Sequence, residues 1–348
     1  MTKLTAVGKN LKNLMKRRPL NSSTEIRITH LCTQRCRQCS VYEKRNEPAS
    51  MSLADFRTIT RRLREYGANI GFISGGEATL VPDLDKMLVE AKKTFPLGTA
   101  LVTGLINRTP IIEKFARVAL ENNIHIQTSL DGLGALGDSL RGAKNFAETV
   151  LEHMKHIADM RARSRSLLYA NIVINNLNIE QVPELIRRAR DLGWRATIGV
   201  YHALTATTRF DEELRLKNDQ RLNKLIDFLV GNPDILNLDA FILGIPAFVK
   251  SHRSEICAFR DAPLLATRLT IMEDGNVHLC YGDPIGNLLR QSLGEIFSGE
   301  AYRQRIAEYG NCPGCWTTCY TQRYLLVHPR SFGELKHNVR KVLGLKKK

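Results

Sequence analysis

The chain has 348 residues, 43% hydrophobic and 25% charged, an ordinary globular composition that allows one large core and a smaller appended unit. No apolar run approaches the roughly 20 residues that span a bilayer, and the N-terminus lacks the apolar region and cleavage site of a signal peptide, which predicts a soluble, cytoplasmic protein. Lys and Arg number 51 against 35 Asp and Glu, and the net charge of +16 favours contact with anions.

The first 24 residues predict a basic amphipathic helix. Leu4, Val7, Leu11 and Leu14 fall on one helical face, with six Lys and Arg residues around them. Such a segment packs under the domain that follows, frays, or lies on an anionic membrane, so peripheral membrane contact is one of three expectations.

From residue 25 to about residue 201, β-rich runs alternate with amphipathic helical stretches. Phe56, Ile59 and Leu63, for example, recur with the spacing of a single buried helix face. Six such repeats predict a parallel sheet with right-handed crossovers. Because eight repeats would close a full barrel, we expect the α/β class and a partial (βα)6 TIM-like barrel. The expected strands are 25–29, 69–74, 99–103, 125–129, 168–174 and 196–200, and the expected helices are 53–66, 83–95, 110–122, 145–162 and 179–192.

After the sixth strand the pattern changes. Residues 211–230 predict one more helix, which Gly231-Asn232-Pro233 ends. A hairpin with strands at 268–272 and 277–281 and a turn-forming Asp-Gly is expected next, then a helix near 292–308. The predicted domains are a basic helical segment (1–24), the partial barrel (25–245), a small cysteine-rich domain (246–325) and a basic tail (326–348) that includes Lys341, Lys346, Lys347 and Lys348.

Eight cysteines fall in two short segments, three at 32–39 and five at 257–319. The cytosol keeps thiols reduced, so closely spaced cysteines indicate metal or iron–sulfur ligands rather than disulfides. Cys32, Cys36 and Cys39 follow the first strand directly. Three thiolates at this C-x3-C-x2-C spacing can hold three irons of a cubane and leave the fourth iron open. The alternative is a zinc knuckle, which needs a fourth ligand, and His30 is the nearby candidate.

This cysteine motif resembles that of the radical SAM superfamily, in which the open iron binds S-adenosylmethionine. Three further segments resemble the family's, and each follows the carboxyl end of a predicted strand, where ligand groups of a parallel barrel collect. Gln38 departs from the pattern, since many members have an aromatic residue there against the adenine. The resemblance implies as cofactor-binding residues Gly75, Gly76, Glu77, Thr103, Ser129, Asp131 and Arg141.

The C-terminal cysteines are similar to the family's auxiliary-cluster domain, called twitch or, in its longer form, SPASM. The resemblance implies one further [4Fe–4S] cluster, two in all, with Cys319 spare or able to replace a ligand. The longer pattern holds two auxiliary clusters on seven cysteines, whereas this segment has five. A structural zinc site on the same cysteines is the alternative. The implied ligands are Cys257, Cys280, Cys312 and Cys315.

The resemblance implies a radical SAM enzyme of oxidoreductase or transferase type. It would reductively cleave S-adenosylmethionine to a 5′-deoxyadenosyl radical and abstract hydrogen from a substrate C–H bond, with net oxidation or bond formation aided by the auxiliary cluster. A flavodoxin- or ferredoxin-type electron donor is expected. Candidate bases for a released proton are His202, Asp261 and Asp283.

The substrate stays open among a small molecule, a lipid and a peptide. Peptide-modifying relatives often carry a leader-binding domain ahead of the barrel, whereas about 24 residues precede the first strand here; a peptide maturase is therefore an alternative. A zinc protein that binds nucleic acid is the competing class. It leaves the strand–helix repeats and Gly75-Gly76-Glu77 unexplained, so a nucleic-acid partner is not expected.

Overall fold

A computed structural model of the chain describes residues 2–43, 48–161, 163–203, 208–265, 267–280 and 282–329, together with residues 333, 335, 336 and 338. The expected strand residue Tyr281 and the lysines Lys341, Lys346, Lys347 and Lys348 lie outside the described residues.

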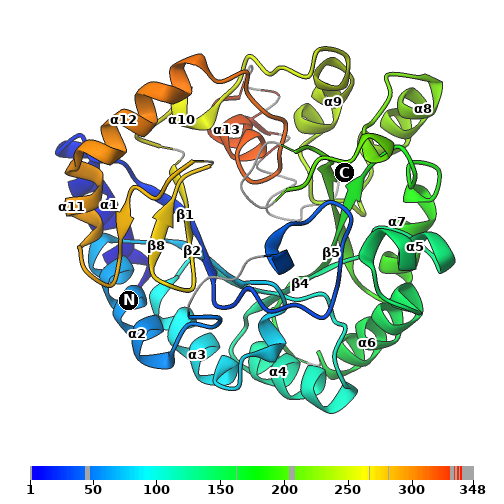
Figure 1. Cartoon of the computed structure of the whole chain (residues 1–348), viewed down its shortest axis with the longest axis horizontal. Coiled ribbons are helices and arrows are strands. Elements are labelled where there is room, and N and C mark those ends of the chain that lie inside the picture. The colour runs from blue at the N-terminus through cyan, green and yellow to red at the C-terminus, as the bar shows by residue number, and fades with distance from the viewer. Residues whose placement is uncertain are drawn as a thin grey trace.

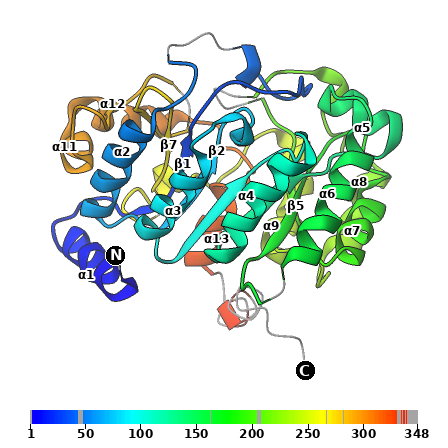
Figure 2. The same cartoon turned by 90° about the horizontal axis from the view of Figure 1, so that it is seen from below.

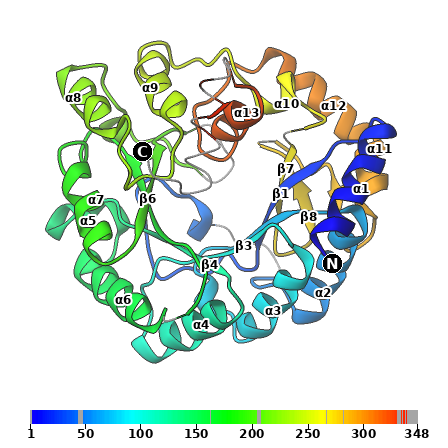
Figure 3. The ribbon, with the colours of Figure 1, turned by 180° about the vertical axis from the view of Figure 1, so that it is seen from behind.

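The predicted α/β class and partial barrel are confirmed. Six parallel strands in sequence order form the curved inner wall of the barrel, and helices line the outside (Figure 1 and Figure 3). The strands are β1 (Asn21–Arg27), β2 (Ile70–Ser74), β3 (Gly98–Val102), β4 (His125–Ser129), β5 (Leu168–Ile174), β6 (Arg195–Val200), β7 (Thr267–Ile271), β8 (Asn276–His278) and β9 (Gly286–Asn287). The helices are α1 (Lys3–Met15), α2 (Leu53–Tyr66), α3 (Leu84–Thr94), α4 (Thr109–Glu121), α5 (Gly134–Arg141), α6 (Phe146–Met160), α7 (Val182–Asp191), α8 (Gln220–Leu229), α9 (Asp239–Ser251), α10 (Ala258–Asp261), α11 (Leu293–Ser298), α12 (Glu300–Glu308) and α13 (Thr321–Val327).

Alternating burial along the strands separates the outer core from the barrel interior. Ile26 of β1 and Ile73 of β2 are fully buried in the hydrophobic cluster that includes Phe56 of α2. Their neighbours Glu25 and Phe72 are only partly buried. Because successive side chains of a strand point to opposite faces, the apolar residues pack under the helices and the polar ones line the interior.

The sheet does not end with the sixth repeat. Its order is β6-β5-β4-β3-β2-β1-β7-β8-β9, with β7 parallel to β1 and the predicted hairpin partner β8 antiparallel to β7. The C-terminal hairpin therefore continues the barrel sheet. The boundary expected near residue 245 falls inside α9, and the division into domains stays a prediction.

Two predicted helices differ from the structure. Residues 211–230 are not one helix: a short 3₁₀ turn at Glu212–Leu214 precedes α8, which begins only at Gln220. The side chain of Asp219 accepts hydrogen bonds from the N–H groups of Arg221 and Leu222, so it caps the helix there. The helix expected near 292–308 is divided at Gly299, whose backbone is extended.

The predicted N-terminal helix is present as α1. In the part of the chain that the structure describes, no helix combines the length and apolar character that crossing a membrane requires.

Packing between the sheet and α3 allows no side chain at Gly71 of β2. A Cβ there would overlap the ring of Phe95, which is fully buried. We predict that Gly71→Ala lowers the free energy of unfolding by about 1–3 kcal/mol, measured by denaturant unfolding of the anaerobic holoprotein.

Gly98 of β3 provides the matched control, because a Cβ there would meet nothing closer than Ile70 Cγ2 at 3.9 Å. Gly98→Ala should change the unfolding free energy by no more than about 0.5 kcal/mol. Equal effects of the two substitutions would show that Phe95 does not limit the packing at Gly71.

Candidate active site

The loop that follows β1 crosses the mouth of the barrel, at the carboxyl ends of the strands (Figure 2), and its sequence includes Cys32, Cys36 and Cys39. Cys36 is buried, and Cys32 and Cys39 are partly buried. The pKa of Cys32 is raised to about 11, mainly by burial and to a smaller extent by the neighbouring Cys36 and Cys39. The three sulfurs are thus close enough to interact, and a bound cation or metal would be needed to hold them as thiolates.

Gly75 and Gly76 let the end of β2 pack directly against the start of this loop. Gly76 N–H donates to the carbonyl of Thr29 at 2.7 Å, and Glu77 N–H donates to that of Leu31 at 2.8 Å. A Cβ on either glycine would collide with the backbone of residues 29–31. The glycines therefore fix the position of the chain immediately before Cys32.

Glu77 and Thr103 form a hydrogen bond with each other at the mouth of the barrel, so these atoms are already used within the protein. Both side chains are buried. Glu77 Oε1 accepts a hydrogen bond from the Thr103 hydroxyl at 2.7 Å, and Oε2 accepts one from Gly104 N–H at 2.7 Å. The carboxylate ties the end of β2 to the end of β3, so its effect on a ligand passes through the backbone.

Asp131 connects three parts of the mouth. Its Oδ2 lies 3.2 Å from Arg141 Nη1 and accepts a hydrogen bond from Gln38 Nε2 at 3.1 Å, while Oδ1 accepts one from Val173 N–H at 2.7 Å. Gln38, which replaces the aromatic residue of the family pattern, thus anchors the cysteine loop to β4 and β5.

Arg141 is a buried cation beside the three thiols. Burial opposes its charge, but the neighbouring Cys36 and Asp131 raise its pKa. Its Nε is buried and, within the described residues, has no hydrogen-bond partner. Ser129, at the end of β4, is partly buried at the same mouth. A guanidinium with an unused donor next to three thiols suits an anionic cluster or a ligand carboxylate, so these residues fit the implied cofactors.

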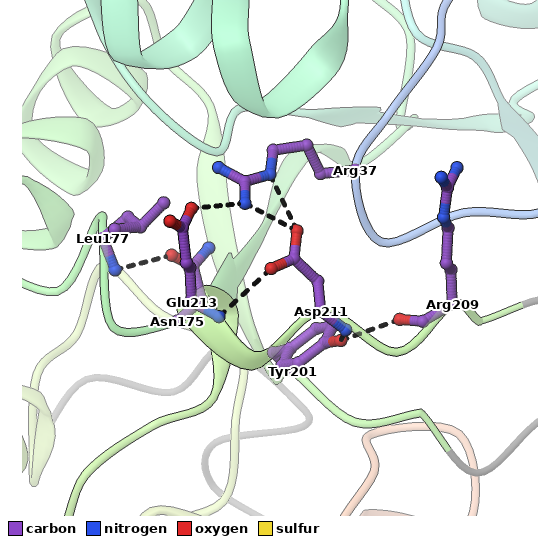
Figure 4. A network of polar contacts seen from close by, with 7 residues as sticks. All are labelled: Arg37, Asn175, Leu177, Tyr201, Arg209, Asp211 and Glu213. Atoms are coloured by element: carbon purple, nitrogen blue, oxygen red, sulfur yellow. Dashed lines mark hydrogen bonds and ion pairs between the residues drawn. The ribbon is translucent and has the colours of Figure 1, made fainter.

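A segment far along the chain clamps the cysteine loop, and sequence reasoning missed it. Arg37 donates to Asp211 Oδ2 through Nε at 2.8 Å and to Glu213 Oε2 through Nη2 at 2.6 Å (Figure 4). We call residues 208–215 the latch segment. An acidic run after β6 marks this segment in the sequence, but its pattern predicts the start of a helix.

Backbone contacts complete this clamp. Arg209 N–H donates to the carbonyl of Gln38 at 2.9 Å, and Cys39 forms an isolated bridge with Thr208. The hydroxyl of Tyr201 accepts from Asp211 N–H and donates to the carbonyl of Arg209, both at 2.7 Å. The latch segment therefore holds the loop from its second cysteine to its third.

The C-terminal cysteines form a second group. One small cavity is lined by Cys257, Cys280, Cys312 and Cys315. Burial raises the pKa of Cys315 to about 12, and Cys257 and Cys312 act in the same direction. The described residues include no group of three His, Cys, Asp or Glu side chains placed to hold a single metal ion.

Cys319 does not line that cavity. It interacts electrostatically with Cys315 of that group, and also with Arg268, Arg323 and Tyr169, side chains of the barrel interior and of α13. The four cysteines predicted as ligands thus line one cavity, and Cys319 lies between Cys315 and the side chains of the barrel interior.

The three candidate bases lie in different surroundings. His202 lines a pocket with Phe248 of α9 and with His252, the residue that follows that helix, and burial lowers the pKa of His202 to about 4. Asp261 forms an ion pair with Arg260 and accepts a hydrogen bond from Cys257 N–H at 2.7 Å. Asp283 is exposed. The structure does not bring the three together, and their catalytic role stays a prediction.

His30, the fourth ligand of the zinc alternative, has another partner. Its Nδ1 lies 2.8 Å from Glu273 Oε1, and both side chains are buried. Since Glu273 lies in the turn between β7 and β8, this pair joins the cysteine loop to the C-terminal hairpin.

A polar network in the barrel interior was also missed. Glu25 Oε1 accepts from the Ser74 hydroxyl at 2.7 Å, and Oε2 lies 2.9 Å from Arg268 Nη2. Burial opposes ionisation of Glu25, but the charges of Arg27 and Arg268 lower its pKa to about 2. The sequence of β1 carries the signal for this network, because the charged residues Glu25 and Arg27 alternate with the apolar Ile26. The apolar face of the strand packs under the helices, so the charged face points into the barrel interior.

Two family descriptions match the chain. Residues 26–204 match the radical SAM superfamily, and residues 263–320 match SPASM, an iron–sulfur cluster-binding domain.

Relatives resemble different shares of the chain. The sporulation killing factor maturation protein SkfB of Bacillus subtilis is 22% identical over 171 residues, which are 49% of this chain and 40% of SkfB. The GTP 3′,8-cyclase of Psychromonas ingrahamii is 23% identical over 287 residues, 81% of this chain and 83% of the cyclase. The crystal structure of Streptococcus suis SuiB bound to the precursor peptide SuiA superposes with a TM-score of 0.66 at 18% identity, covering 87% of this chain and 71% of SuiB. The chain thus spans less than half the length of SkfB, and the likeness to SuiB shows a shared fold.

The placement of the cysteines predicts unequal effects of two substitutions. Cys315→Ala should remove the second cluster, seen as loss of about half the iron and of one low-temperature EPR signal, and should lower stability, because ligands also staple the domain. Cys319→Ala should keep both clusters. Loss of the second cluster in Cys319→Ala and its retention in Cys315→Ala would contradict this ligand set.

The clamp predicts that Arg37→Ala weakens iron retention in the first cluster. Losing two charged hydrogen bonds, a partly buried one to Asp211 and an exposed one to Glu213, should destabilise the loop by about 1–3 kcal/mol and speed iron transfer to a chelator. Arg187→Ala is the control, because that guanidinium pairs with Glu184 on the exposed face of α7. Identical rates of iron transfer in both variants would leave the clamp without a function.

Proposed function

The chain belongs to the radical SAM superfamily, and from that premise we propose that it removes a hydrogen atom from a C–H bond of a substrate held inside the barrel. Its cofactors are [4Fe–4S] clusters and S-adenosylmethionine. When bound, they supply a 5′-deoxyadenosyl radical. The observation that carries the proposal is the group of three interacting thiols beside the buried cation Arg141, at the mouth of a barrel with a polar interior.

We propose that Cys32, Cys36 and Cys39 hold the first cluster. S-adenosylmethionine would then contact the backbone of residues 75–77, the hydroxyl of Ser129 and the guanidinium of Arg141. Glu77, Thr103 and Asp131 would act as positioning residues, because their carboxylates and hydroxyl are used in holding the strand ends together. This division of roles follows from the contacts that each side chain already makes.

We propose one auxiliary [4Fe–4S] cluster on the four cysteines that share the C-terminal cavity, two clusters in all. Supporting contacts hold these ligands: Asp261 accepts from Cys257 N–H, and the hydroxyl of Tyr309 accepts from Cys280 N–H at 3.1 Å. A cluster there could accept an electron from the substrate, making the net reaction an oxidation or a bond formation. A zinc site is the alternative, and metal analysis separates the two.

The interior side chains define what the substrate meets. Arg27, Arg268 and Arg323 carry three positive charges, and Glu25 carries one negative charge, so the described network is positive on balance. Arg268 also lies 5.1 Å from the centre of the Phe72 ring. These groups favour a substrate with a carboxylate or phosphate.

Two substrate classes are supported by different observations. A peptide is favoured by SkfB, a maturation protein, and by SuiB, whose structure contains a precursor peptide. A small anionic molecule is favoured by the arginines of the interior and by the match to the GTP 3′,8-cyclase over most of both chains. We propose the peptide first and the small anion second.

For a released proton we propose His202 as the base. Burial lowers its pKa to about 4, which keeps the imidazole in its neutral form at pH 7, and the side chain lines a pocket. Asp261 and Asp283 are less suited to accept a proton from the substrate, because Asp261 is paired with Arg260 and Asp283 is exposed to solvent. An oxidoreductase rather than a transferase outcome fits this proton release.

We further propose a flavodoxin- or ferredoxin-type protein as electron donor and the cytoplasm as the compartment. Eight unpaired thiols and oxygen-sensitive clusters fit a reducing environment.

The proposal predicts that anaerobically reconstituted protein holds about eight irons, four in each cluster. Replacing Cys32, Cys36 and Cys39 together with Ala should remove about half of them and abolish 5′-deoxyadenosine formation. Cys315→Ala, as control, should lose the other half and keep substrate-free cleavage. Continued 5′-deoxyadenosine formation by the triple variant would refute the assignment, and zinc in place of iron would favour the zinc-protein class.

The same assay distinguishes the substrate classes. Deuterated peptides and deuterated small anions are offered separately, and transfer of deuterium into 5′-deoxyadenosine identifies the one that is used.

A further inference from the structure

Helix α1 presents its apolar side chains to solvent. Leu4 is 85% exposed, Leu11 57% and Met15 86%, with Val7 between them at 48%. Their spacing places them in one stripe along the helix. A surface helix ordinarily turns such a stripe toward the core, so this one is inverted.

Polar groups hold the helix in this orientation. Asn13 Nδ2 donates to the carbonyl of Tyr66 at 2.9 Å, Asn10 Nδ2 to Asn69 Oδ1 at 3.1 Å, and Lys9 Nζ to the carbonyl of Arg64 at 2.8 Å. Asn10 and Asn13 are buried under the helix. Because these contacts fix the polar side against the end of α2, the stripe cannot turn inward without breaking them.

The surroundings of the stripe are strongly basic. Residues 1–24 contain six Lys and Arg residues and no Asp or Glu. Lys3, Lys12, Lys16, Arg17 and Arg18 are exposed, and Lys3 interacts electrostatically with Lys92 of the neighbouring α3.

We infer that the exposed face of α1 lies on an anionic lipid bilayer, with the stripe in the acyl boundary and the lysines among the headgroups. A stripe of about three turns flanked by cations matches the planar, negatively charged surface of a membrane. A second copy of the chain would bring the same positive charges together and oppose pairing, so charge complementarity favours the lipid.

The placement of α1 orients the molecule on the membrane. Figure 2 shows α1 at the end of the barrel opposite the cysteine loop. The mouth with its proposed cofactor site then faces water, accessible to an electron donor. The inference is independent of the proposed reaction.

Co-sedimentation of the full-length holoprotein with two kinds of vesicle tests this inference. We expect binding to vesicles of phosphatidylcholine mixed with phosphatidylglycerol and little binding to phosphatidylcholine alone. Leu4→Ser/Leu11→Ser should weaken the partitioning by roughly tenfold or more. The control Phe228→Ser/Leu243→Ser removes apolar side chains that are 37% and 59% exposed on α8 and α9, and this variant should bind like the unchanged protein.

Folding is checked separately. Since both leucines are exposed, Leu4→Ser/Leu11→Ser should keep its iron content and its unfolding midpoint. Three outcomes would overturn the inference: no binding to anionic vesicles; binding that needs the lysines but not the leucines, which is adsorption by net charge; or dimerisation that the leucine substitutions abolish in the absence of vesicle binding.

Discussion

The docking of the end of β2 against the first residues of the cysteine loop sets the geometry on which the rest of the site depends. Two backbone hydrogen bonds join residues 76 and 77 to Thr29 and Leu31, and no residue larger than glycine fits at positions 75 and 76. Cys32 is thereby tied to the sheet. Glu77, buried beneath this contact, extends the connection to β3 through Thr103. Cys32, the first cysteine of the motif, is therefore held in place by contacts to two parallel strands, β2 and β3.

The other side of the loop is also anchored to strand ends, but there the contacts are made by charged side chains instead of backbone groups. Asp131 binds Gln38 and Arg141 at once, and Arg37 is held by the latch segment. Each of these contacts joins the loop to a different strand end. A loop of this length could sample many conformations, and ordering it costs conformational entropy. The loop is anchored to β2, β4, β5 and the segment after β6, and these contacts offset that cost. The same contacts bring the three thiols close together. Burial raises the pKa of Cys32 and of Cys36, which disfavours their free thiolates and favours the metal-bound form.

The sequence predicted the parts of this arrangement that depend on local pattern. The strands β4 and β5 were predicted to the residue, since alternation and turn residues mark them. It did not predict contacts between residues far apart in the chain. Arg37 and Asp211 are 174 positions apart, and nothing local distinguishes Asp211 from the start of a helix. Asp219 shows the opposite case: its capping role was readable locally, but the amphipathic run on either side of it outweighed that single residue. The pairing of β7 with β1 likewise depends on which sheet edge is free.

Helix α1 shows a further limit of pattern reasoning. Periodicity identifies an apolar face but not what that face contacts. Two buried asparagines determine which face of α1 points inward. Their amide groups donate to the carbonyl of Tyr66 and to the side chain of Asn69, and leaving these donors unpaired inside the protein would cost free energy. With Asn10 and Asn13 turned inward, the geometry of a helix places Leu4, Leu11 and Met15 outward. The basic flanks then become meaningful together with the stripe: cations alone would make an ordinary solvated surface, and leucines alone an aggregation hazard, whereas their combination on a fixed helix describes a surface suited to lipid.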